Sequence, residues 1–301
     1  MTYPKLVLSS NTPKVFFSSK WTRCYLQLRG VLLEFFSTDN ITEPTLSLPV
    51  SGCTFSSITK SNQSCIIITY DEVPDIFFHT SSYKENLDWL AALQSSQALG
   101  KYLNLCDIEG CNSDPDVLKI FSSDLNNLTA FSLHNKSLPV NIYSALAVPL
   151  ECSHLNSLTI SHCSLTDEAL SFLENPLSRI TSLLDFDLSH NNLTEIGGNI
   201  IGRVLSRSHS IRKLLLGNNS LGDGGLEAII SGLSSHRVAS TTGPVALQCL
   251  SVANNGISAQ GVSLMVESMV VDSENGDVFV EVPIEQLDLS GNKFGDLGVS
   301  F

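Results

Sequence analysis

The stretch LLDFDLSHNNL at residues 183–193 decides the fold of most of this chain. It follows the pattern Leu-x-x-Leu-x-Leu-x-x-Asn-x-Leu, and three later stretches repeat it, namely IRKLLLGNNSL from Ile211, LQCLSVANNGI from Leu247 and IEQLDLSGNKF from Ile284. Two weaker copies come earlier, LTAFSLHNKSL from Leu128 and LNSLTISHCSL from Leu155. A pattern that recurs along a chain predicts an array of repeats instead of one globular core.

The spacing of the copies fixes the length of the repeat. The first four copies start at residues 128, 155, 183 and 211, which are 27 or 28 residues apart, and the last two intervals are 36 and 37 residues. The additional residues fall in 236–245 and 272–283, which are rich in Ser, Thr, Gly and charged residues. We therefore expect two loop insertions, each between a helix and the next strand.

The residue type at each position of the copy has a physical reason. In a short strand the leucines at positions four and six point to one side, so positions three, five and seven face the other. The residue at position nine lies in the turn, where an Asn amide can bind backbone groups that the bend leaves unpaired. After the turn comes an apolar period typical of a helix, as in TEIGGNIIGRVL after Leu193. The predicted position-nine ladder is Cys163, Asn191, Asn219, Asn255 and Asn292.

Residues 98–127 precede the clear copies. Leu103, Leu105 and Ile108 keep the register of the repeat 28 residues upstream of Leu128, and Asp114–Pro115 is a helix-start signal. We therefore expect a degenerate capping repeat at 98–127 and six repeats at 128–301. The last repeat is incomplete, which favours a fragment or a partner that covers that edge.

Residues 1–97 have a different pattern. The segments KWTRCYLQLRG and VLLEFFSTD read as two strands with a tight connection at Arg29–Gly30, and LSLPVSGCTF, SCIIITY and DIFFHTS follow as further strands. YKENLDWLAALQSSQ at residues 83–97 predicts an amphipathic helix that contains Trp89. The segment is predicted to be a small antiparallel β-barrel closed by this helix.

Both parts resemble known families. Residues from about 100 to 301 are similar to the ribonuclease-inhibitor-like leucine-rich repeats, with parallel strands inside and helices outside. Residues 1–97 look like a pleckstrin-homology domain, whose second strand would start at Trp21 and whose helix Trp would be Trp89. The order of the two domains is similar to that of the actin-capping-protein regulators with leucine-rich repeats. The resemblance implies an intracellular scaffold, and a role in actin regulation follows from it alone.

The composition of the chain limits the classes of partner that it can bind. The formal net charge is -13, and residues 98–301 hold ten Lys or Arg against 22 Asp or Glu. An acidic repeat region argues against nucleic acid and favours a basic or cytoskeletal protein. The start of the chain lacks a signal sequence, no apolar run reaches the length of a membrane span, and the eight cysteines show no disulfide framework. We expect a cytoplasmic protein that acts in part at the plasma membrane.

Candidate contact residues follow from repeat positions three and five, which face outward on the predicted concave strand face. They are Asp185, Asp187, Lys213, Leu215, Gln286 and Asp288. No nucleophile elbow, phosphate-binding Gly-Lys-Ser/Thr loop or His-Glu-x-x-His motif is present, so we predict no enzyme, no cofactor and no metal. His162 and His190 share position eight, where a hydrogen-bonded or solvated pair is favoured over a metal site.

Two alternatives to the scaffold stay open. Lys14, Lys20 and Arg23 would give weak contact with anionic lipid, because the basic residues that phosphoinositide-binding relatives use fall here on Thr22 and Cys24. A GTPase-activating protein of the leucine-rich repeat type would need an Arg on a rim loop. Its candidates are Arg179, Arg203, Arg207, Arg212 and Arg237.

Overall fold

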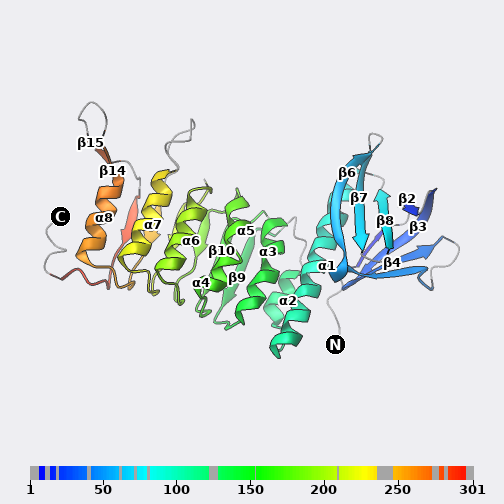
Figure 1. Cartoon of the computed structure of the whole chain (residues 1–301), viewed down its shortest axis with the longest axis horizontal. Coiled ribbons are helices and arrows are strands. Elements are labelled where there is room, and N and C mark those ends of the chain that lie inside the picture. The colour runs from blue at the N-terminus through cyan, green and yellow to red at the C-terminus, as the bar shows by residue number, and fades with distance from the viewer. Residues whose placement is uncertain are drawn as a thin grey trace. The chain divides into compact units, whose positions relative to one another are not determined.

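The structure is a computed structural model that describes residues 7–10, 14–17, 20–38, 42–60, 63–70, 73–79, 82–121, 128–152, 154–208, 210–235, 247–272, 278–280 and 284–295. The chain divides into two compact units, Met1–Leu128 and Thr129–Phe301 (Figure 1). The predicted loop at 236–245, residue Arg237 and the helix expected after Phe294 lie outside the described residues.

The described part of the first unit forms eight antiparallel strands joined edge to edge in the order β5-β4-β3-β2-β8-β7-β6, with β1 also paired to β3. The strands are β1 (Val7–Ser10), β2 (Lys14–Phe17), β3 (Lys20–Arg29), β4 (Leu32–Ser37), β5 (Leu46–Pro49), β6 (Thr54–Lys60), β7 (Gln63–Tyr70) and β8 (Val73–His79). A short 3-10 helix, Val50–Gly52, separates β5 from β6. This arrangement confirms the predicted antiparallel fold.

Alternating side chains and one glycine explain the central hairpin. In β3, Leu26 and Leu28 are fully buried, while Gln27 between them is only half-buried. Gly30 turns the chain into β4 with a φ of 60°, a left-handed conformation that glycine adopts without strain. The tight connection predicted at Arg29–Gly30 is therefore present.

Helix α1 (Tyr83–Glu109) closes the sheet. Ser82 caps it, because its side chain accepts the backbone N–H of Glu85 at 3.2 Å. Trp89 is 1% exposed and lies edge-on to the Phe78 ring, with the ring centroids 5.8 Å apart. Farther along the helix, the Ser96 hydroxyl donates to the Gly30 carbonyl at 2.5 Å. The helix is thus tied to the hairpin turn as well as to the core.

The capping repeat predicted at 98–127 is wrong in its first half. Residues 98–109 continue α1, so Leu103, Leu105 and Ile108 lie on a helix and not on a strand. The side chains that this half of the helix buries are those of Ala98, Leu99, Tyr102 and Cys106. No residue between 97 and 109 breaks a helix as Pro does, and the helix ends at Gly110, whose φ is 63°.

Helix α2 (Pro115–Phe121) starts where the sequence predicted a helix. Asp114 caps it by accepting the backbone N–H of Asp116 at 2.8 Å. The helix packs on the second half of α1, since the Ser95 hydroxyl donates to the Phe121 carbonyl at 2.7 Å and the rings of Tyr102 and Phe121 lie 5.5 Å apart. Both helices belong to the first unit.

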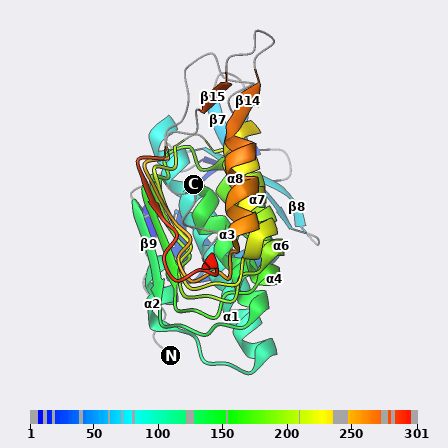
Figure 2. The same cartoon turned by 90° about the vertical axis from the view of Figure 1, so that its left-hand side faces the viewer.

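The described part of the second unit stacks six parallel strands in the order β16-β13-β12-β11-β10-β9. The strands are β9 (Ala130–His134), β10 (Ser157–Ser161), β11 (Asp185–Asp187), β12 (Lys213–Leu215), β13 (Cys249–Ser251) and β16 (Gln286–Asp288). The helices are α3 (Tyr143–Cys152), α4 (Asp167–Ser171), α5 (Glu174–Arg179), α6 (Glu195–Leu205), α7 (Gly222–Ser235) and α8 (Ala259–Met269). Figure 2 shows this unit nearly end-on, with the strands in one layer and the helices in the other.

The register of the sheet matches the repeat. Position four of each copy pairs with position four of the next, and these side chains are buried in the first five copies. They are Phe131, Leu158, Phe186, Leu214 and Leu250. The leucines that define the pattern therefore form the core between strands and helices, as predicted for a strand-and-helix solenoid.

One expected loop contains strands. Val270–Asp272 (β14) pairs antiparallel with Val278–Val280 (β15), so the prediction of a loop over residues 272–283 is wrong for the second strand. The triplets VVD and VFV consist mostly of valine and phenylalanine, and β-branched and aromatic residues favour strands. The insertion after α8 thus adds a short ribbon to the solenoid.

Candidate functional site

The exposed surface of the sheet, called here the strand face, consists of repeat positions three and five. Hydrogen-bond register places the members of each position side by side on neighbouring strands. Position three gives Ala130, Ser157, Asp185, Lys213, Cys249 and Gln286, and position five gives Ser132, Thr159, Asp187, Leu215, Ser251 and Asp288. The six contact residues proposed from the sequence all belong to this set.

The strand face is acidic, and half of its twelve side chains are small. Asp185 and Lys213 pair directly across β11 and β12, and both are exposed. Asp187 is half-buried beside them, and Asp288 is exposed at the far edge of the sheet. Three carboxylates and one ammonium group on a shallow surface favour a basic partner over an acidic one.

Two of the three carboxylates also accept hydrogen bonds that stabilise the turn after their strand. Asp187 accepts the backbone N–H of Ser189 at 2.9 Å, and Asp288 accepts that of Ser290 at 3.0 Å. The hydrogen bonds from Ser290, its side chain first, and the bond from the Ser251 hydroxyl lower the pKa of Asp288. Asp185 has no such turn bond, so it is the carboxylate whose replacement disturbs the repeat least.

Position nine forms a buried ladder beneath the turns. The side-chain nitrogen of Asn191 donates to the carbonyls of Ile160 and Leu188, and its oxygen accepts the backbone N–H groups of Cys163 and Leu165. Asn219, Asn255 and Asn292 repeat this bonding in the following turns. Each amide joins two adjacent repeats. Burial raises the pKa of the Cys163 thiol, which donates to the Ser161 carbonyl at 3.2 Å.

The position-eight residues form a second column, and each of them has a left-handed backbone conformation. Its members Asn135, His162, His190, Asn218, Asn254 and Gly291 all have φ between 52° and 70°. Asn and Gly are the residues most often found there, and His is also enriched. His162 and His190 are exposed at this rim, and their rings stack with centroids 3.8 Å apart. His134, at position seven of the first copy, joins the stack, which the repeat pattern alone did not indicate.

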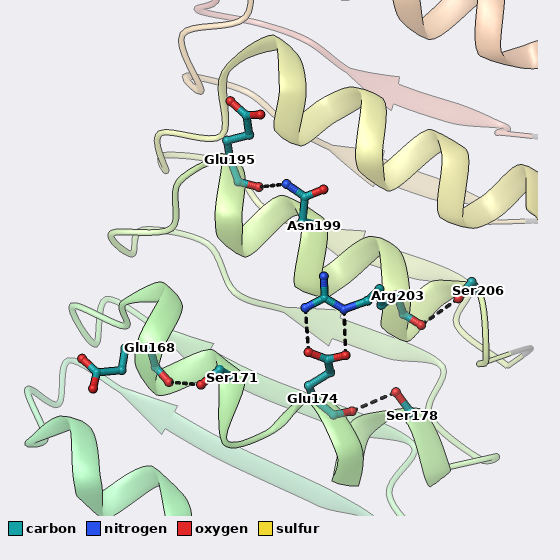
Figure 3. Close-up of polar contacts among 8 residues, drawn as sticks. All are labelled: Glu168, Ser171, Glu174, Ser178, Glu195, Asn199, Arg203 and Ser206. Carbon is teal, nitrogen blue, oxygen red and sulfur yellow. Dashed lines mark hydrogen bonds and ion pairs between the residues drawn. The ribbon is translucent and has the colours of Figure 1, made fainter.

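The helix side carries an ion pair. Arg203 on α6 binds both carboxylate oxygens of Glu174 on α5, each at 2.8 Å, as Figure 3 shows. The guanidinium group lowers the pKa of Glu174 through these bonds. A shallow groove of about 230 Å³ lies beside Arg203, between α6 and α7, and Gly202, Ala228 and Gly232 also line it. Arg203, one of the five candidates for a catalytic Arg, is thus paired with a carboxylate in this structure.

The three basic residues proposed for lipid contact lie on β2 and β3. Lys14 pairs with Arg23 across the two antiparallel strands, and Lys20 pairs with Phe17. Two of the three basic residues are therefore direct cross-strand neighbours. Their side chains are outside the described part of the structure.

The described residues include neither a cluster suited to a metal ion nor a helix suited to span a membrane. There, no three His, Cys, Asp or Glu side chains come together in a way that could hold a metal ion. The stacked rings of His162 and His190 lie nearly parallel, at 13°. None of the described helices combines the length and the apolar character needed to span a membrane.

Comparisons with known families agree with the two units. The model of the PH domain matches residues 6–98, and the model of the Leucine Rich repeat matches residues 151–173, 207–229 and 283–301. The chain is a PH domain followed by leucine-rich repeats. The N-terminal sheet with α1 is the PH domain, and the six-stranded parallel stack is the leucine-rich repeat unit.

Curated relatives match parts of the chain at low identity. "Leucine-rich repeat-containing protein 45" of Gallus gallus is 29% identical over 43% of this chain and 18% of its own length. "NACHT, LRR and PYD domains-containing protein 3" of Bos taurus is 25% identical over 68% and 21%, respectively. "Protein phosphatase 1 regulatory subunit 37 homolog" of Caenorhabditis elegans is 28% identical over 50% and 15%. The chain thus spans about a fifth or less of these relatives.

Solved structures of PH domains are among those similar to the chain. The C-terminal PH domain of pleckstrin in complex with D-myo-Ins(1,2,3,5,6)P5 is 17% identical, with 32% of this chain and 99% of that chain covered and a TM-score of 0.28. The PH domain of human oxysterol binding protein-related protein 11 is 15% identical, with 36% and 90% covered and a TM-score of 0.28.

Proposed function

We propose that this chain is a non-catalytic, cytoplasmic adaptor whose leucine-rich repeats bind a basic protein surface through the strand face. The observation that carries the proposal is that Asp185, Asp187 and Asp288 occupy positions three and five of one in-register sheet, where Asp185 and Asp288 are exposed and Asp187 is half-buried. Lys213 is the one basic side chain among positions three and five. The family matches support binding by this unit, since the leucine-rich repeat scaffold offers extended surfaces for partners.

Affinity at such a face depends on area and on charge complementarity. Small side chains such as Ala130, Ser132 and Ser157 leave the strand backbone accessible, so a partner can lie close to several repeats at once. Carboxylates at the surface raise the association rate of a basic partner more than they raise its affinity. Binding is therefore expected to weaken as the salt concentration rises.

The test is a pull-down from cell lysate with the whole chain as bait. Asp185→Lys reverses one exposed charge on the strand face, and Glu168→Lys makes the same change on exposed α4, on the helix side. We expect proteins captured by the wild type to be lost or depleted about five-fold with Asp185→Lys and retained with Glu168→Lys. Equal recovery with both variants, or recovery of no protein at all, would contradict the proposal.

A second proposal concerns the PH domain, which we suggest contacts an anionic membrane weakly and so places the adaptor at the plasma membrane. The supporting observation is the cross-strand pairing of Lys14 with Arg23. Liposome flotation with and without a phosphoinositide tests it. Enhanced recovery that Lys14→Ala and Arg23→Ala together abolish is expected, whereas equal recovery on neutral and anionic liposomes would contradict it.

A role in the actin cytoskeleton rests on the resemblance in domain order alone, and we propose it only as the setting in which to look for the partner. The GTPase-activating alternative is not favoured, because nothing in the described residues singles out one of its candidate arginines, and Arg203 is bound to both oxygens of Glu174.

A further inference from the structure

Three imidazole rings meet at the rim of the strand face. His162 and His190 stack face to face, with ring centroids 3.8 Å apart and planes at 13°. His134 lies edge-on to His162 at 5.1 Å and 75°. The three residues come from three successive repeats, so the solenoid itself brings them together. All three side chains are exposed and can exchange protons with water.

A chain of hydrogen bonds extends from His190 along the rim. The Asn218 side-chain nitrogen lies 3.2 Å from His190 Nε2, and the Asn254 nitrogen donates to Asn218 Oδ1 at 3.2 Å. With the Asn218 amide oriented in this way, its nitrogen donates and His190 Nε2 accepts. At the other end of the stack, His134 Nδ1 lies 2.8 Å from the hydroxyl of buried Ser161.

Protonation changes this arrangement in two ways. A proton on His190 Nε2 would face the donor nitrogen of Asn218, so the Asn218 amide has to turn over and present its oxygen. Asn254 must then follow, because its nitrogen would face the nitrogen of Asn218. In addition, a second positive ring only 3.8 Å from the first is repelled by it. Binding of one proton to His190 therefore changes side-chain hydrogen bonds in at least two neighbouring repeats.

The charged groups around the stack come from three repeats. The negative charge of Asp187 on β11 favours the charged form of His162. Removal from water, followed by the repulsion of His190 and His134, outweighs Asp187 and lowers the pKa of His162. Lys136 follows the His134 turn and adds positive charge near Cys163. Asp185 and Lys213 lie farther along the same strands, at position three.

We propose that His134, His162 and His190 form one coupled proton-binding unit, which weakens the binding of a basic partner at the strand face as the pH falls. The regulatory half of this inference rests on the proposed function. As the stack gains positive charge beside Asp187, it offsets the carboxylates that attract the partner. The unit therefore acts between about pH 7.5 and about pH 5.5, where imidazoles change charge.

The coupling is tested without any partner. Two-dimensional NMR of the whole chain, isotope-labelled on histidine, follows each ring as the pH is lowered. We expect His162 to protonate last, and His162→Asn to make His134 and His190 protonate at higher pH than in the wild type. Asn suits the left-handed backbone at this position. Independent titration of the three rings, unchanged by His162→Asn, would overturn the proposal.

Regulation is tested with an oligolysine peptide as probe. Between about pH 7.5 and about pH 5.5 the wild type should lose about five-fold in affinity, the effect of one unit charge at about 4 Å in water. The double variant His162→Asn, His190→Asn should lose clearly less, whereas His154→Asn, an exposed histidine outside the stack, should behave like the wild type. An equal loss in wild type and double variant would overturn the regulatory inference. If the peptide fails to bind even at about pH 7.5, both the proposed function and its regulation by pH are contradicted. The NMR experiment still tests whether the three rings are coupled.

Discussion

The side-chain oxygen of Asn191 accepts the backbone N–H of Cys163 at 3.0 Å, although the two residues occupy the same position in successive repeats. The same oxygen accepts the N–H of Leu165, also at 3.0 Å, and the amide nitrogen donates back to the carbonyl of Ile160. One buried side chain therefore satisfies backbone groups on two turns. The stacking of the repeats depends on these bonds as well as on the leucine core.

Replacing Asn191 by Ala should destabilise the leucine-rich repeats by about 3 kcal/mol, because several buried backbone groups lose a polar partner. Chemical denaturation followed by circular dichroism measures the loss. Asn192→Ala is the matched control, since Asn192 is exposed at the next position, and its change should stay within about 0.5 kcal/mol. Equal effects of the two variants would mean that the ladder does not hold the repeats together.

Much of the repeat unit could be predicted from the sequence, because the pattern sets strand, turn and helix independently in each copy. The leucines at position four and the contact candidates at positions three and five follow from counting along a 28-residue period. Their alignment across the sheet then follows from the parallel register. The role of these candidates in binding stays a prediction, since charge alone does not identify a partner.

Residues 98–109 show where periodicity misleads. Leu103 and Leu105 fit the spacing of a strand in the repeat, yet the segment contains no Pro between Gln97 and Gly110 and continues the helix that precedes it. Its buried side chains Leu99, Tyr102 and Cys106 follow the period of a helix, which was the better guide. The ring of His134 was missed for a related reason, since position seven of one turn lies beside position eight of the next only in three dimensions.

Gly202→Ala tests the close contact of α6 with α7. A Cβ at Gly202 would collide with the Ala228 carbonyl oxygen. In an isolated helix the change from Gly to Ala stabilises by about 1 kcal/mol, whereas overpacking here should destabilise by about 2 kcal/mol. The sign of the change in the free energy of unfolding therefore decides between the two effects. Glu227→Ala, at an exposed position on α7, is the control and should leave stability almost unchanged.

Trp89→Ala tests the core of the PH domain. Trp89 is 1% exposed, and its ring contacts Phe78 edge-on. Removal of so large a buried side chain should destabilise the domain by about 4 kcal/mol, while Trp89→Phe should cost less because most of the core contact remains. Tyr83→Ala on the same helix, where Tyr83 is 67% exposed, should have little effect. Thermal unfolding of the three variants ranks them, and an equal melting temperature for all three would contradict the packing.

The ion pair between Glu174 and Arg203 predicts a pH-dependent contribution to stability. Arg203 lowers the pKa of Glu174 in the folded chain, so this contribution is present above the unfolded pKa and is lost as the pH falls through the folded pKa. Because the Arg203 side chain is 51% exposed, water screens the pair, and Glu174→Gln should destabilise by only about 0.5 kcal/mol at neutral pH. Wild type and variant should become equally stable only in acid below the folded-state pKa of Glu174, which lies under the value for a free Glu, about 4.3. Glu168→Gln on exposed α4 is the control. A difference that persists in acid would show that Glu174 acts through packing and not through its charge.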